Sequence, residues 1–210
     1  SIAGPETSDS DFTWAEFVRR NNSELVAAWG NLVNRTAAMI AKNFGEIPAA
    51  GELEEIDREL LDAVGTGFET VGDSIAHHHQ RAALTEIMRL VGEANAYVTR
   101  TEPFKLKGDD QRERLATVLH TLIQCVSDLN TILAPVLPHA ANRVHAVLGG
   151  RGQFMPMPVI ADVSGLDGDA DRTYPVITGE YSNTPRWGRT PVVVGTPIVK
   201  PAPVFTKLDD

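Results

Sequence analysis

Cysteine is nearly absent from this sequence, and long apolar runs are absent altogether. The 210 residues contain one cysteine, Cys125, which excludes an internal disulfide and a multi-cysteine zinc site. Its apolar surroundings, LIQCVSDL, predict a buried structural thiol in a reducing, cytoplasmic setting. No stretch reaches the roughly 18 consecutive apolar residues of a membrane span, and the first residues lack the basic and apolar regions of a secretory signal.

Positive charge is also scarce. Lys and Arg number 19 against 28 Asp and Glu, so the formal net charge is −9. This balance argues against non-specific binding of nucleic acid, which depends on neutralising phosphates. It still allows one local site that reads the shape and the bases of an RNA. The hydrophobic content of 42% is typical of soluble globular proteins rather than of disordered chains.

Apolar residues recur every three or four positions over five segments, which is the period of a helix. Thr13 and Glu16 have the spacing of a capping box at the start of the first segment. Short connections between the segments predict an all-α fold with a five-helix bundle. The predicted helices run over residues 14–44, 53–79, 82–99, 110–133 and 138–148.

Composition changes after Gly150, because residues 151–210 hold eight of the 13 prolines and show no helical period. We expect an irregular appendage with short strands, such as 191–194, that packs against another part of the protein. A partly disordered tail is the alternative. The chain therefore divides into a leading segment at 1–12, a helical domain at 13–150 and a Pro/Gly-rich appendage at 151–210.

Common catalytic and metal-binding patterns find no support. The glycine-rich residues 149–152 follow a predicted helix rather than a strand, so they do not form a phosphate-binding loop. His77, His78 and His79 are consecutive and would point about 100° apart on a helix, which prevents them from facing one ion together. No Gly-x-Ser-x-Gly motif is present, and nothing pairs Cys125 with a histidine.

The first informative stretch is a helical stripe of small and polar residues. Asn31 and Arg35 are four residues apart in it and therefore adjacent on the helix surface. The donor fork of Arg and the amide of Asn together can hydrogen-bond the exposed edge of a base. A solvated helix face with an incidental Asn–Arg pair is the alternative. The stripe consists of Glu24, Ala28, Asn31, Arg35, Ala38 and Lys42.

The second informative stretch joins Ala94-Asn95-Ala96-Tyr97 to the segment Glu102-Pro103-Phe104-Lys105-Leu106. It places an aromatic ring just beyond a helix end, beside a proline and two lysines. An aromatic side chain held next to positive charge can stack on an unstacked RNA base. The alternative is that Phe104 caps the core of the bundle.

At these two stretches the sequence resembles methionyl-tRNA synthetases, and in style it is similar to the actinobacterial enzymes. Nearly the whole chain takes part in the resemblance. It implies the class I helical anticodon-binding bundle, which recognises the CAU anticodon of methionine tRNA, and it makes residues 1–12 a linker from a catalytic domain. The matching motifs lie at 11–14, 22–35, 94–104, 135–139 and 203–209.

The resemblance also implies site residues. The family's base-reading Asn and Arg fall on Asn31 and Arg35. Its stacking aromatic, usually Trp, falls on Phe104, so the aromatic face is kept here while the indole N–H is lost. The basic residues that we expect to contact phosphates are Arg19, Arg20, Lys42, Lys105 and Lys107.

The catalytic signatures of the family are absent from this chain. It has no His-Ile-Gly-His-type motif, no Lys-Met-Ser-Lys-Ser-type loop and no zinc-knuckle cysteines. The resemblance therefore implies part of an enzyme without a catalytic site, metal or cofactor of its own, whereas the parent enzyme uses ATP and Mg. The expected partners are methionine tRNA and the catalytic domain of the same enzyme, in a cytoplasmic monomer with no membrane contact.

Three alternatives stay open. One is the equivalent bundle of a class I synthetase for valine, isoleucine, leucine or cysteine, against which the two informative stretches argue. A second is a helical protein-interaction module without an RNA role, which the charge of −9 favours and which predicts no salt-dependent tRNA binding. The third is the complete enzyme, with its catalytic half removed or supplied by another chain.

Overall fold

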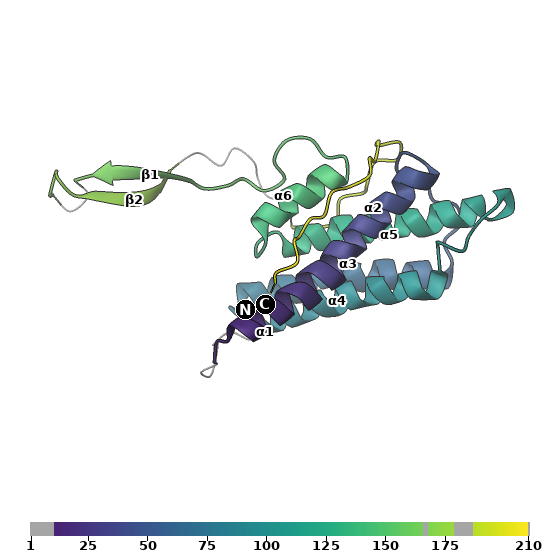
Figure 1. Ribbon diagram of the computed structural model, residues 1–210, viewed down its shortest axis with the longest axis horizontal. Helices are drawn as coiled ribbons and strands as arrows, with labels where there is room; N and C mark the ends of the chain where they lie inside the picture. Colours follow the sequence, from purple (N-terminus) through teal and green to yellow (C-terminus); the bar gives the residue numbers. More distant parts are fainter. Residues whose placement is uncertain (1–10, 166–167, 179–186, 210) are drawn as a thin grey trace.

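The computed structural model describes residues 11–165, 168–178 and 187–209, and these residues are mostly helical (Figure 1). The predicted helical bundle is confirmed, with ends that differ from the predicted ones by at most three residues. No described helix is long and apolar enough to cross a membrane. The helical elements are α1 (Trp14–Arg20), η1 (Asn21–Gly30), α2 (Asn31–Asn43), α3 (Glu55–Ala76), α4 (Gln80–Thr101), η2 (Asp109–Gln111), α5 (Arg112–Leu133) and α6 (Pro138–Val147).

The first helix, formed by α1, η1 and α2 in succession, is not α-helical throughout. Its middle part, η1, is a π-helix, and the N–H of Asn31 points back to the carbonyl of Val26, five residues earlier. The segment begins with Asn-Asn-Ser and ends in Gly30, which are weak α-helix formers. The wider turn was not predicted from the sequence, because a pattern of apolar residues every three or four positions does not distinguish it from an α-helix.

Thr13 caps the first helix as predicted, since its hydroxyl oxygen accepts a hydrogen bond from the Glu16 N–H at 3.2 Å. The second half of the predicted capping box is not formed. Instead, the Glu16 carboxylate accepts hydrogen bonds from Arg19 at 2.7 Å and from Arg20 at 2.5 Å.

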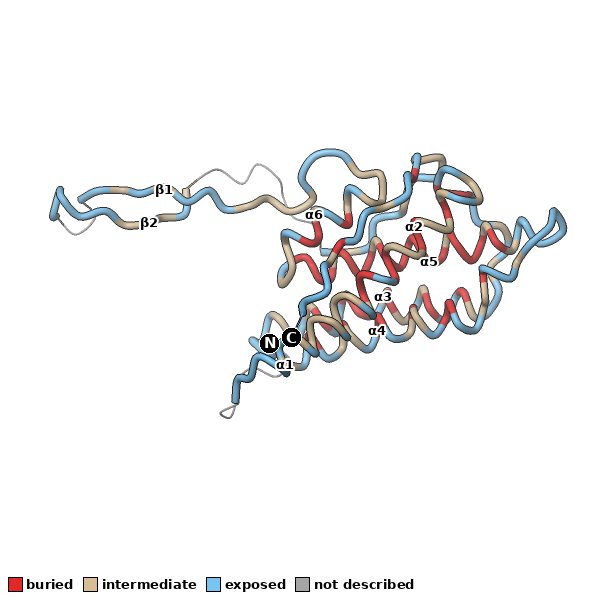
Figure 2. The backbone as a smooth tube through the Cα atoms, viewed as in Figure 1, coloured by how far each residue is buried: buried red, intermediate tan, exposed pale blue. Residues whose placement is uncertain are grey.

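The core lies where α2, α3, α4 and α5 face one another, and Figure 2 shows the buried residues along these inner faces. Helix α5 is central, because it packs against α2, α3, α4 and α6. Its residue Cys125 is fully buried, as predicted, and burial raises the pKa of the thiol. A protonated, inaccessible thiol is unsuited to nucleophilic chemistry.

The segment after α6 first forms a hairpin that projects from the bundle (Figure 1). Strand β1 (Val159–Ser164) pairs antiparallel with β2 (Thr173–Thr178), with Val159 opposite Thr178. The strand expected at 191–194 is not formed, so that prediction was wrong. Pro191 lacks an N–H, and the Val192 N–H bonds the side chain of Gln124 at 2.9 Å instead of a neighbouring strand.

Residues 187–209, which we call the returning tail, run back along the bundle and pack against it (Figure 1). Ile198 and Val204 belong to the core, at 3% and 5% exposure. Arg189 forms an ion pair with the buried carboxylate of Asp128 at 2.8 Å. Burial raises the pKa of Asp128, and the charge of Arg189 opposes that rise. This part of the appendage therefore supplies both apolar contacts and a countercharge to the bundle.

Candidate nucleic-acid interface

Asn31 and Arg35 lie on the first two turns of α2, beside the face that enters the core. Leu32, Val33 and Thr36 are buried on that face and fix the rotation of the helix. The Asn31 side chain is consequently exposed, while Arg35 is half-buried at the edge of the core. The structure thus brings the two predicted base-reading residues together on one side of α2.

Asn95 on α4 holds the guanidinium of Arg35. Arg35 Nη2 donates a hydrogen bond to Asn95 Oδ1 at 2.6 Å. The amide nitrogen of Asn95 donates to the carbonyls of Val91 at 2.8 Å and Ala28 at 3.3 Å, which leaves its oxygen for the arginine. One asparagine therefore links α4 to the first helix and orients Arg35.

The charge of Arg35 is only partly compensated. Burial lowers the pKa of its guanidinium, which still remains ionised at neutral pH. Its Nε is buried without a hydrogen-bond partner, and no carboxylate among the described residues forms an ion pair with it. A buried donor without a partner costs about 1–3 kcal/mol, so the fold bears a local cost to hold this guanidinium at the edge of the core.

Phe104 projects into solvent from the loop after α4. Glu102 ends the helix in the left-handed conformation, with φ of 42°, and its carbonyl accepts a hydrogen bond from the Lys105 N–H at 2.8 Å. This tight turn buries Pro103 and leaves Phe104 57% exposed. Phe104 therefore does not cap the core, and its ring is free to stack on another planar group.

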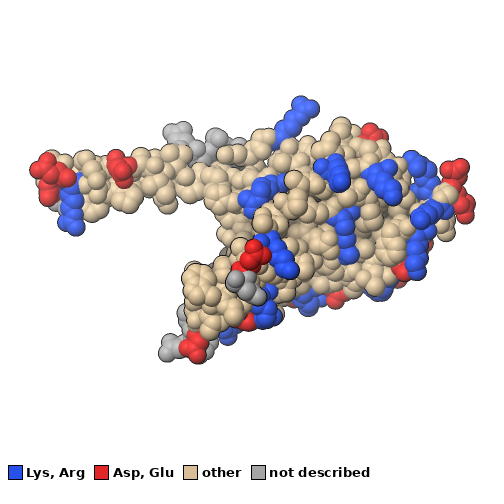
Figure 3. All heavy atoms as spheres, in the orientation of Figure 1, with Lys and Arg blue, Asp and Glu red and all other residues tan. Residues whose placement is uncertain are grey.

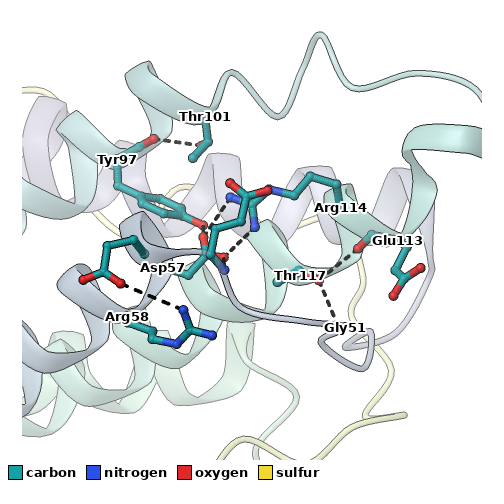
Figure 4. Close-up of polar contacts among 10 residues, drawn as sticks. Gly51, Asp57, Arg58, Tyr97, Thr101, Glu113, Arg114 and Thr117 are labelled. Carbon is teal, nitrogen blue, oxygen red and sulfur yellow. Dashed lines mark hydrogen bonds and ion pairs between the residues drawn. The ribbon is translucent and has the colours of Figure 1, made fainter.

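A buried polar network fixes the helices beneath this loop (Figure 4). The Tyr97 hydroxyl donates to Asp57 on α3 at 2.5 Å, and Arg114 on α5 makes two hydrogen bonds to the same carboxylate. Burial acts to raise the pKa of Asp57, but the bonds from Arg114 and Tyr97 outweigh it, so the pKa lies below its usual value. In the Ala94–Tyr97 motif, Asn95 thus positions Arg35, whereas Tyr97 joins three helices.

Arg35 and Phe104 are connected through α4. Asn95, which holds Arg35, lies six residues before the end of α4 at Thr101, or roughly 9 Å along the axis. Phe104 follows in the turn immediately after that end. The structure thus places the predicted stacking residue at the end of the helix that orients the predicted base-reading arginine.

The predicted phosphate-contacting residues fall into two groups. Lys42, Lys105 and Lys107 are exposed near the end of α2 and in the loop of Phe104, and Lys105 pairs with Glu102 at 2.7 Å. Arg19 and Arg20 lie on α1, roughly 22 Å along the first helix from Arg35. Their hydrogen bonds lower the pKa of Glu16 to about 2, so this pair is engaged by an acidic neighbour.

The contact of Asn95 with Arg35 was not predicted from the sequence, although Asn95 belongs to a recognised motif. Its partner Arg35 is 60 residues away in the sequence, and no local spacing reveals that contact. For the histidines, the structure places His77 and His79 at the exposed end of α3. Within the described residues, no group of three His, Cys, Asp or Glu side chains is arranged to hold a metal ion.

Comparison with known proteins agrees with the resemblance seen in the sequence. Residues 1–37 match the family model described as "tRNA synthetases class I (M)". A methionine–tRNA ligase from Nocardioides sp. is 60% identical over 209 residues, covering 100% of this chain and 34% of that protein. One from Beutenbergia cavernae is 57% identical over 213 residues, again covering 100% of this chain and 34% of the relative. The chain thus spans about a third of the length of these relatives.

Solved structures show the same fold. The free methionyl-tRNA synthetase of Mycobacterium tuberculosis aligns with a TM-score of 0.77 at 22% identity, covering 99% of this chain and 37% of that one. The same organism's enzyme bound by methionyl-adenylate aligns with a TM-score of 0.71 at 23% identity, covering 93% of this chain and 34% of that one. These structural similarities show a shared fold, whereas the evidence for homology comes from the relatives with 57–60% sequence identity.

Proposed function

We propose that this chain, which is homologous over its full length to about a third of methionine–tRNA ligases, carries the surface of such an enzyme that recognises the CAU anticodon of methionine tRNA. Residues 13–150 would form the RNA-binding unit and residues 151–210 an appendage that contributes to it. The ATP- and Mg-dependent charging of the tRNA, in the cytoplasm, belongs to the catalytic part outside this chain. That part and the tRNA are the proposed partners of a monomeric enzyme.

The observation that carries the proposal is the half-buried guanidinium of Arg35. It is charged and held in place by Asn95, it reaches the surface, and no described carboxylate forms an ion pair with it. Such a group is suited to a ligand that presents acceptors in a defined plane, as the edge of a base does. Asn31, one turn earlier, adds both a donor and an acceptor at the same surface.

In the proposed mechanism, the first anticodon base leaves its stack and lies against the ring of Phe104. Cytosine presents acceptors at O2 and N3 and a donor at its N4 amino group. Arg35 donates to the acceptors, and the side-chain oxygen of Asn31 accepts from the amino group. Uracil has a carbonyl in place of the amino group, so it would leave the oxygen of Asn31 facing another acceptor.

Phe104 in place of the family's usual Trp keeps the stacking part of this mechanism. Stacking of a base on an aromatic side chain contributes about 1–3 kcal/mol and does not depend on the identity of the base. Phe104 would therefore supply affinity, while Asn31 and Arg35 would supply the preference for cytosine.

The test is the binding of methionine tRNA to an Arg35→Ala variant, with the CAU anticodon and with its first base changed to U. We expect the wild-type preference for cytosine to fall by about 1–3 kcal/mol, the value of one good bidentate contact to a base. Arg89→Ala is the matched control, because Arg89 is an exposed arginine on α4 that pairs with Glu86 at 2.7 Å. Unchanged discrimination in Arg35→Ala would refute the assignment.

A further inference from the structure

A groove lies between α2 and the returning tail, and it continues the surface that carries Asn31 and Arg35. Its volume is about 560 Å³, and three residues from each side line it. Two backbone hydrogen bonds hold the tail in place here. The Ile198 N–H donates to the Gly45 carbonyl at 2.9 Å, and the Ile47 N–H donates to the Thr196 carbonyl at 2.9 Å. The lining residues are Ala38, Ala41, Lys42, Ile198, Val199 and Lys200.

The groove joins two lysines that are far apart in the sequence. Lys42 comes from the last turn of α2 and Lys200 from the tail, and both side chains are exposed. The lining includes no carboxylate, and neither ammonium forms an ion pair with another residue in the described ranges. By contrast, Lys105 nearby is paired with Glu102. The two charges in the groove are therefore available to an anion from outside.

The surroundings of the groove are basic in a protein that is acidic as a whole. Figure 3 shows Lys and Arg side chains gathered on the face above α2 and the returning tail, with few acidic side chains between them. The formal charge of the whole chain is −9, so this concentration is local. An anionic partner is accordingly drawn to this part of the surface rather than to the molecule at large.

The groove is also in register with the proposed base-reading site. Arg35, Ala38 and Lys42 are spaced by three and four residues, so they form one continuous stripe along α2. Lys42 lies two turns beyond Arg35, or about 10 Å along the axis. An RNA strand with one base bound at Arg35 can therefore continue over the small side chains of Ala38 and Ala41 toward Lys42 and Lys200.

We propose that this groove binds the sugar–phosphate backbone of the RNA next to the recognised anticodon base, and that Lys42 and Lys200 each contact a phosphate of it. The inference rests on the proposed function and extends it to the returning tail. The alanines leave room for a ribose, and the ammonium groups of Lys42 and Lys200 neutralise phosphate charge. These contacts supply affinity without reading the sequence, because phosphates are the same in every nucleotide.

The size of the effect follows from counterion release. Each phosphate neutralised on a single-stranded segment changes the slope of log K against log salt by about 0.7. Loss of one such contact therefore weakens binding about fivefold at 0.1 M salt. The loss is the same for a CAU anticodon and for one with a changed first base, since the contact is to the backbone.

The experiment measures binding of the 210-residue chain to methionine tRNA over a range of salt concentrations, for Lys42→Gln, Lys200→Gln and the double variant. Lys207→Gln is the matched control, because Lys207 is an exposed lysine on the same tail. It lies beside Leu208, which is bonded to Asn22 at 2.8 Å. That position is roughly 30 Å along the first helix from Lys42.

We expect each single groove variant to bind about fivefold more weakly at 0.1 M salt and the double variant about 25-fold more weakly, all with a smaller salt slope, while Lys207→Gln matches the wild type. If Lys200→Gln binds tRNA with the same affinity and salt slope as Lys207→Gln, while Arg35→Ala still loses the preference for cytosine, the groove proposal is refuted and the proposed function stands. If the wild type itself shows no preference for CAU, the proposed function fails, and the groove proposal fails with it.

Discussion

Replacement of Asn95 by alanine tests whether Arg35 is positioned by its neighbour on α4. The substitution removes the 2.6 Å bond to Arg35 and the bonds to the carbonyls of Val91 and Ala28. A hydrogen bond to a charged group contributes about 1.5–3 kcal/mol, and part of that is regained when water reaches the half-buried guanidinium. We expect a stability loss of about 1–2 kcal/mol, measured by urea unfolding.

The effect of Asn95→Ala on recognition should be larger than its effect on affinity for RNA in general. A guanidinium without its anchor samples other rotamers, so we expect the preference for cytosine over uracil to fall about tenfold, or about 1.4 kcal/mol. Asn43→Ala is the matched control, because Asn43 is a half-buried helical asparagine that bonds the Met39 carbonyl at 2.7 Å. It should lose comparable local hydrogen bonding without a change in preference.

A double-mutant cycle decides whether Asn95 acts through Arg35. If it does, Asn95→Ala has no further effect on discrimination once Arg35 is already alanine, and the coupling energy falls in the range of about 0.5–3 kcal/mol. Two effects that simply add would show that Asn95 does not act through Arg35, because Asn95 would then contact the RNA or alter the site independently. Unchanged discrimination in Asn95→Ala alone would show the same.

Three further predictions concern the network, the stacking residue and the tail. Arg114→Met leaves the buried Asp57 uncompensated and should cost about 3–5 kcal/mol in urea unfolding at pH 7. The pKa of Asp57 is lower in the folded state than in the unfolded state, so ionised Asp57 stabilises the wild type above about pH 4. This stabilisation is lost as the pH falls through the folded pKa. The difference in unfolding free energy between the wild type and Arg114→Met should therefore become smaller in acid. Phe104→Ala should weaken tRNA binding by about 1–3 kcal/mol without a change in unfolding, since the ring is 57% exposed, and Phe104→Trp should retain the binding. Arg189→Met should destabilise the chain by about 3–5 kcal/mol at neutral pH, because it leaves the buried Asp128 without its countercharge. This loss of stability should shrink as acid protonates Asp128, whose pKa is already raised by burial. A loss that does not change with pH would contradict a role of Arg189 as the countercharge of Asp128.

The helices and the position of Asn31 beside Arg35 on one side of α2 could be predicted because both depend on local spacing. A helix repeats every 3.6 residues, so the apolar pattern locates its buried face and a four-residue separation makes two side chains neighbours. The exposure of Phe104 was not decided by the sequence. It follows from the left-handed turn at Glu102 and the burial of Pro103, which depend on how the loop meets the bundle.

The contacts between distant segments could not be predicted from one sequence. Asn95 and Arg35 are 60 residues apart, and Arg189 meets Asp128 across 61 residues. The strand expected at 191–194 failed for the same reason, since Gln124 on α5 takes the hydrogen bond that a neighbouring strand would otherwise receive. Tertiary contacts override the local β-propensity of an apolar run.

The most direct test of the central claim is equilibrium binding of the wild-type chain to methionine tRNA, with CAU and with its first base changed, at two salt concentrations. We expect tighter binding to CAU at both concentrations, with affinities for both RNAs that fall as salt rises. Equal affinity for the two anticodons, or no salt-dependent binding, would exclude anticodon recognition by this chain and favour a helical module without an anticodon-reading role.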